Sequence, residues 1–121
     1  MKTFDNLKDT LKPLTQIVEK TVDASIPQVS SEFLTDSNFY IPFQVGDLKR
    51  SGIEHSQFHL GLVIWQTPYA RRLFYNPQYN FSKDANPYAQ GLWAEKAKEE
   101  NKTKYKRITS DNFEQAKKDV L

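Results

Sequence analysis

Residues 60–75, LGLVIWQTPYARRLFY, constrain the fold more than any other segment of this 121-residue sequence. Its residues 62–65, LVIW, form the most apolar run of the chain. A short apolar run that ends at a breaker is typical of a buried strand. Pro68 is the breaker, since proline cannot donate to a sheet ladder but fits the first turn of a helix, with Thr67 as its N-cap. The segment therefore predicts a buried strand, a sharp corner and a short helix that carries Arg71 and Arg72.

The first third of the chain predicts helices. Apolar residues recur at steps of three and four from Phe4 onward, which predicts a helix to about Ala24. Pro13 lies inside this helix, so we expect a kink or a break there. Ser25 and Pro27 have the spacing of a cap and a first-turn proline, which predicts a further short helix.

Two segments, residues 53–58 and 60–66, predict the strands of a hairpin, after a loop in which Gly46 suits a turn with positive φ. Together with the helices, this predicts an α+β fold. N-terminal helices pack on a small, mainly antiparallel sheet, and a long ordered loop and C-terminal helices follow. The length of the chain suits a single domain, residues 1–121, with its own core.

The segment of residues 76–90 contains two Asn-Pro pairs and no period, which predicts a long ordered loop. Aromatic residues in or beside such a loop are expected to pack against another surface. We expect this loop to lie against a neighbouring subunit or ring and to be ordered mainly there. A short helix should follow around Trp93, and Ser110 or Asp111 should cap a last one. We expect residues 101–121 to form a tail that is mobile or becomes ordered only against a neighbour.

Known catalytic and ligand-binding patterns are absent from the sequence. It contains no cysteine, no Ser-His-Asp order, no paired-carboxylate motif and no glycine-rich phosphate loop. His55 and His59 would lie about 13 Å apart on one extended strand, too far for a shared metal ion. No apolar run approaches the roughly 20 residues of a membrane span. We therefore expect no catalytic, cofactor or metal site, no enzyme activity and no membrane partner.

Charge is distributed unevenly along the chain. Residues 1–48 hold four lysines and seven acids, whereas residues 49–121 hold thirteen basic residues and eight acids. One reading is a solvated surface. The other is head-to-tail association of copies, which closes into rings. The acidic side would then carry Asp23, Glu32, Asp36 and Asp47, and the basic side Arg71, Arg72 and residues 102–107.

Two motifs, read together, resemble a family of phage proteins. IPFQVGDLKRSG, residues 41–52, resembles the Pro-x-x-x-Gly-x-Leu-x-x-Ser element of head–tail connector and tail-completion proteins. WQTPYARRLFYN, residues 65–76, followed by NPYAQGLWAEKAK, residues 86–98, is similar to the minor capsid protein branch of that family, from long-tailed phages of Gram-positive hosts. The motif positions are Pro42, Gly46, Leu48, Ser51, Trp65, Pro68, Tyr69, Ala70 and Trp93. Where the family commonly has Asp-Thr before the glycine, this sequence has Gln44 and Val45.

The resemblance implies a structural protein of the phage neck. It would form a homo-oligomeric ring, twelve-fold or six-fold, between the head-closure or portal side and the tail terminator. DNA would pass through the lumen without sequence-specific binding. The protein would lie in the host cytoplasm during assembly and in the virion afterwards. We expect contacts between subunits or rings at Arg71, Arg72, Tyr75, Tyr79, Phe81 and Tyr88.

Two other functions stay open at this stage. The first is a tail-terminator or tail-tube-like protein, which would contact a different ring. The second is a nucleic-acid-binding module, because the basic residues of segment 102–107 flank Tyr105 and could hold phosphates beside a stacking base. A solvated, charged connector is the alternative reading of the same segment.

Overall fold

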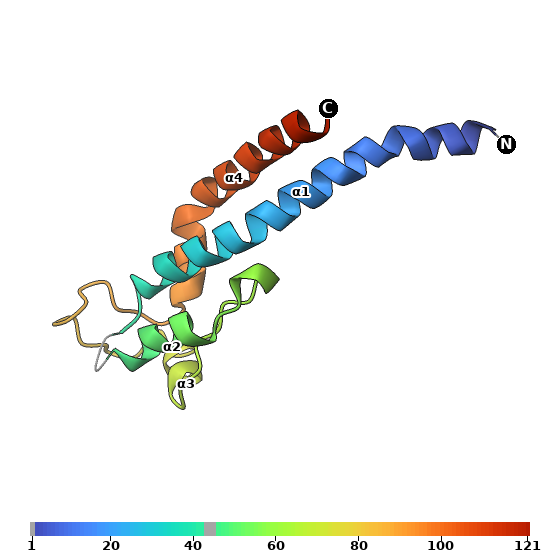
Figure 1. Ribbon diagram of the computed structural model, residues 1–121. Coiled ribbons are helices and arrows are strands. Elements are labelled where there is room, and N and C mark those ends of the chain that lie inside the picture. The colour runs from blue at the N-terminus through green and yellow to red at the C-terminus, as the bar shows by residue number, and fades with distance from the viewer. Residues whose placement is uncertain (1, 43–45) are drawn as a thin grey trace.

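The computed structural model describes residues 2–42 and 46–121, with side chains from Asn6 onward. Two long helices, α1 (Lys2–Asn38) and α4 (Trp93–Val120), pack side by side and run in opposite directions (Figure 1). Three short helices lie between them in sequence: α2 (Asp47–His55), the 3₁₀ helix η1 (Phe58–Leu60) and α3 (Ala70–Phe74). Helices α1 and α4 form a helical hairpin, the α1–α4 hairpin, and α2 and α3 gather at its end away from both termini (Figure 1).

Helix α1 continues through both of its prolines, so a break at Pro13 and a separate helix from Pro27 are wrong. Each proline removes one backbone hydrogen bond and clashes with the preceding turn. Figure 1 shows that the helix curves instead of breaking. Around Pro27 the contacts that α1 makes with α4 hold the helix together, and packing of this kind routinely overrides local propensity.

Helix α4 also replaces two predicted elements with one. Residues 93–120 form a single helix, and the caps expected at Ser110 or Asp111 lie in its interior. Both helices bury small residues: Thr21 and Ser25 on α1, and Ala97 and Ala116 on α4. The segment expected to form a tail, residues 101–121, thus belongs to α4 and its C-cap.

The predicted α+β fold is wrong, because the described residues contain no β-sheet. The single bridge in this part of the chain joins Gln57 and Leu62, and residues 53–55, expected in a strand, end helix α2. Two serine hydroxyls take the place of a partner strand. Ser56 Oγ accepts from the Ile64 N–H at 2.9 Å, and Ser51 Oγ accepts from the Gln66 N–H at 3.2 Å. The N–H groups of Ile64 and Gln66 thereby have hydrogen-bond acceptors without a neighbouring strand.

The core lies where the two sequence motifs meet. Ile41, Leu48, Ala70 and Trp93 form one buried cluster, with partly buried aromatic residues packed against it. The motif positions are distributed over this region: Pro42 and Ser51 are buried, Trp65 and Tyr69 are half-buried, Pro68 is exposed, and Gly46 has a φ of 80° as the turn requires. Gln44 and Val45 lie outside the described residues. The apolar run itself is only half-buried, and Leu62 is exposed.

The loop of residues 76–90 contains no helix or strand, as predicted, and is tied to the end of α1. The buried Asn86 donates from Nδ2 to the carbonyl oxygens of Phe39 and Ile41, at 2.8 and 2.9 Å, and accepts from the Tyr88 N–H. Gln90 N–H donates to the Tyr40 carbonyl at 3.0 Å. These contacts within the chain hold the loop at the end of α1, and its contact with a neighbouring subunit or ring stays a prediction.

Candidate assembly surface

The predicted contact residues of the corner lie on and just after α3. Arg71 and Arg72 are exposed, and neither forms an ion pair with a carboxylate of the described residues. Tyr75, at the C-cap of α3, is 63% exposed, and the Arg71 guanidinium lies 5.8 Å from its ring centre. A cationic and aromatic surface is thus held on α3 and its C-cap at the edge of the core.

Two adjoining hollows shape this surface. The first, of about 250 Å³, is lined by Trp65, Ala70, Arg71, Phe74, Tyr75 and Trp93. The second, of about 550 Å³, is lined by Pro68, Arg71, Arg72, Tyr75 and Asn76. Arg71 and Tyr75 stand between the two. The structure therefore brings a mainly aromatic hollow next to a cationic one.

The aromatic loop contributes its predicted residues unequally. Tyr79 and Tyr88 are exposed and Phe81 is half-buried, with the Tyr79 and Phe81 rings in edge contact at 6.1 Å. Tyr88 stacks on Phe39 at 4.6 Å between ring centres. Three tyrosines are thus exposed: Tyr79 and Tyr88 on the loop, and Tyr75 at the C-cap of α3.

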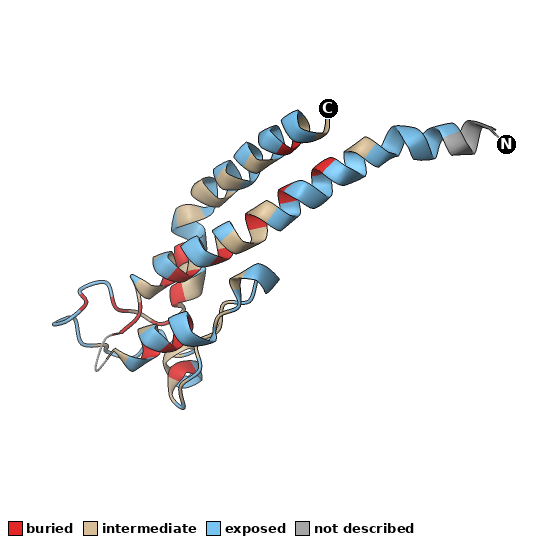
Figure 2. Ribbon diagram, viewed as in Figure 1, coloured by how far each residue is buried: buried red, intermediate tan, exposed pale blue. Residues whose placement is uncertain are grey.

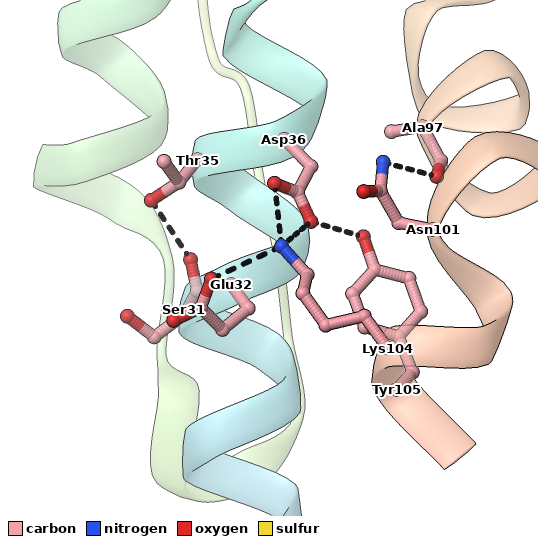
Figure 3. A network of polar contacts seen from close by, with 8 residues as sticks. All are labelled: Ser31, Glu32, Thr35, Asp36, Ala97, Asn101, Lys104 and Tyr105. Carbon is pink, nitrogen blue, oxygen red and sulfur yellow. Dashed lines mark hydrogen bonds and ion pairs between the residues drawn. The ribbon is translucent and has the colours of Figure 1, made fainter. Parts of the chain in front are cut away.

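A polar network joins α1 to α4 (Figure 3). It includes Glu32, Asp36 and Lys104, which belong to the charged sides expected to meet between copies. Lys104 Nζ lies 2.6 Å from Asp36 Oδ2 and 3.2 Å from Glu32 Oε2. The Tyr105 hydroxyl donates to Asp36 Oδ2 at 2.7 Å, and its ring meets Phe33 edge-on. Asp36 and Lys104 are therefore engaged within one chain.

This environment alters the titration of both α4 residues. Burial raises the pKa of the Tyr105 hydroxyl, and the hydrogen bond to the Asp36 carboxylate raises it further above its ordinary value. For Lys104, partial burial lowers the pKa, but the hydrogen bonds to Asp36 and Glu32 outweigh it, so that the pKa lies above its ordinary value. Both shifts favour the protonated forms that bind Asp36.

The basic segment of residues 102–107 is divided between two sides of α4. Lys102, Lys106 and Arg107 are exposed, whereas Lys104 and Tyr105 face α1. The aromatic ring that could stack on a base is therefore occupied. The histidines, His55 and His59, lie in α2 and η1, and the described residues hold no group of acids and histidines placed to bind a metal ion.

The N-terminal part of α1 exposes an apolar stripe. It runs past the end of α4 (Figure 1), and Figure 2 shows mostly exposed residues along it. The stripe consists of Leu7, Leu11, Leu14, Val18 and Val22, which are between 43% and 56% exposed. Their spacing of three and four places them on one side of the helix. A single copy of the chain leaves this side uncovered.

Comparison with known families decides what kind of protein this is. A family model described as minor capsid protein matches residues 7–112. The chain belongs to the minor capsid protein family. No curated protein and no solved structure matches it. Membership makes this minor capsid protein a structural component of a bacteriophage virion. None of its described helices is long and apolar enough to cross a membrane.

Sequence reasoning missed three structural residues of this minor capsid protein. Ser51 was noted only as a motif position, and Ser56 and Asn86 were not singled out. Asn86 carries a signal that could have been used, since it begins an Asn-Pro pair in an aromatic loop. The serines carry none, because their acceptor role depends on how α2 packs beside residues 62–66.

Proposed function

We propose that this minor capsid protein forms a ring in the phage neck, between the portal or head-closure side and the tail, around the DNA exit channel. Family membership over residues 7–112 carries the proposal, because it establishes a structural virion role. The ring contains copies that meet through unlike faces, as closed head-to-tail association requires.

Surfaces that a single copy leaves uncovered support the proposal. The apolar stripe of α1 and the corner with Arg71, Arg72 and Tyr75 differ in chemistry and lie on different elements. Exposed apolar residues in a contiguous row are typical of interaction sites. Some charges remain for contacts between copies, including Asp23 on α1 and Lys102 on α4, which form no ion pair among the described residues.

The nucleic-acid alternative loses its main argument in the structure. Tyr105 packs on Phe33 and bonds Asp36, so only the exposed cations of the segment could meet DNA. Such cations suit a channel that DNA passes without sequence-specific binding.

A nonsense mutation in the gene tests the neck role. Cells infected with the mutant phage should accumulate filled heads and separate tails that do not join, as seen by electron microscopy of the lysate. Supply of the intact protein from a plasmid should restore complete virions.

Complete virions without the protein would refute the role. Tails of irregular length on otherwise joined particles would favour the tail-terminator alternative instead.

A further inference from the structure

The aromatic hollow beside α3 is built like a receptor for one side chain. Its walls are four aromatic rings in edge contact: Trp93 lies 4.9 Å from Phe74 and 6.0 Å from Trp65, and Phe74 lies 5.0 Å from Tyr75. Its volume of about 250 Å³ is below the roughly 300–1,000 Å³ of sites for drug-sized ligands. The hollow therefore suits a single bulky apolar group better than a whole small molecule.

The two tryptophans that line the hollow differ in the surroundings of their indole N–H groups. Trp93 is 1% exposed, and its indole N–H has no partner among the described residues. The other tryptophan differs, since Trp65 Nε1 donates to Asn38 Oδ1 at 3.0 Å. The two indole N–H groups therefore have different surroundings, so their signals report separately on the two rings.

The charge beside the hollow specifies what should flank the apolar group. Arg71 lines both hollows and Arg72 lines the second, and the described residues offer neither of them a carboxylate. Arginine binds carboxylates through paired hydrogen bonds. An occupant with an acidic side chain next to its apolar one would meet both features at once.

We propose that this surface docks an acidic peptide segment of a neighbouring protein, whose bulky apolar side chain fills the aromatic hollow and whose adjacent carboxylate binds Arg71 and Arg72. The inference deepens the proposed function and rests on it, because a neck protein must hold neighbours on both sides. Buried anchors of this type, surrounded by a polar rim, dominate the affinity of protein interfaces.

Indole N–H resonances test the proposal directly. The chain has two tryptophans, so ¹⁵N-labelled full-length protein should give one indole signal for Trp65 and one for Trp93. The probe is the peptide acetyl-Gly-Phe-Asp-Gly-amide. Titration should move the Trp93 signal in a saturable way. Peptides with Ala in place of Phe, or Asn in place of Asp, should bind at least about tenfold more weakly.

Matched variants identify the charge contact. Arg71→Gln combined with Arg72→Gln should weaken binding of the Phe-Asp peptide about tenfold or more. Arg50→Gln, which removes another exposed arginine, should leave binding unchanged. An unmoved Trp65 signal in each variant, before peptide is added, shows that the core is intact.

Several results would overturn the inference. These are no saturable movement of the Trp93 signal, equal binding of the Asn peptide, or equal binding by the double arginine variant. Movement of the signal with protein concentration alone would assign the hollow to a second copy, which also overturns it. The titration is independent of the nonsense-mutant experiment, so the docking site and the neck role can fail separately.

Discussion

At some positions of this protein, close contacts that cannot be read from the sequence determine which residue type fits. Gly52 lies in α2, and a Cβ atom added there would come within 2.7 Å of both Leu34 Cδ1 and Trp65 Nε1. The Trp65 ring cannot retreat without losing its hydrogen bond to Asn38. Gly46 could be predicted because a turn requires its positive φ, whereas Gly52 sits in an ordinary helix.

Gly52→Ala should therefore destabilise the protein, although the same change in an open helix stabilises it. Overpacking costs about 1–3 kcal/mol, and helix propensity returns up to about 1 kcal/mol. We expect a net loss of about 1–2 kcal/mol in the free energy of unfolding, measured by urea denaturation. Ile53→Ala, on an exposed side chain of the same helix, is the control. A stability equal to or above that of the wild type would contradict this packing.

Asn86→Ala should loosen the aromatic loop. The change leaves the Phe39 and Ile41 carbonyls without their donor and the Tyr88 N–H without its acceptor. Unpaired buried groups cost about 1–3 kcal/mol each. Hydrogen exchange at the Tyr88 amide should accelerate at least tenfold, whereas Asn80→Ala, at an exposed loop position, should not change it. Equal protection in both variants would show that the loop is held by other contacts.

At the scale of elements, sequence patterns predicted most helices and failed on their boundaries and on the sheet. The N-terminal helix, the short helix near Arg71 and the helix around Trp93 are all present. Pro27 and the caps inside α4 misled because packing between the two helices outweighs local signals. The predicted hairpin failed because the hydroxyls of Ser51 and Ser56 accept amides that a strand would have paired.

The α1–α4 contact should weaken at alkaline pH. The pKa values of Tyr105 and Lys104 are both raised in the folded state, so their stabilisation is complete below the unfolded pKa values and is lost as pH rises through the folded ones. Thermal melts should show Tm falling above about pH 10, where unfolded tyrosine and lysine begin to lose their protons.

Tyr105→Phe isolates the tyrosine contribution to this pH dependence. It should lower Tm at pH 7, because the hydrogen bond to Asp36 is lost, and should reduce the fall in Tm above about pH 10. Tyr75→Phe, at an exposed tyrosine, should behave as wild type. An unchanged slope in the Tyr105 variant would mean that the helix contact does not depend on this proton.

For the whole molecule, the charge asymmetry in the sequence has two uses. Part of it pairs within the chain, through Glu32, Asp36 and Lys104, which no local pattern could reveal because the partners are about 70 residues apart. The exposed remainder, including Arg71 and Arg72, is available to neighbours.

The candidate surface was predictable as a cationic, aromatic corner. The aromatic hollow was not, because Trp65 and Trp93, distant from each other in the sequence, both line it.

The central claim concerns the place of this minor capsid protein in the virion, and a cryo-electron microscopy map of the intact phage neck tests it most directly. We predict a ring of α1–α4 hairpins around the DNA channel, with each copy meeting the next through unlike faces and with Arg71 and Arg72 at a contact. Hairpins found only in the capsid shell, or copies joined by identical patches around two-fold axes, would contradict the account.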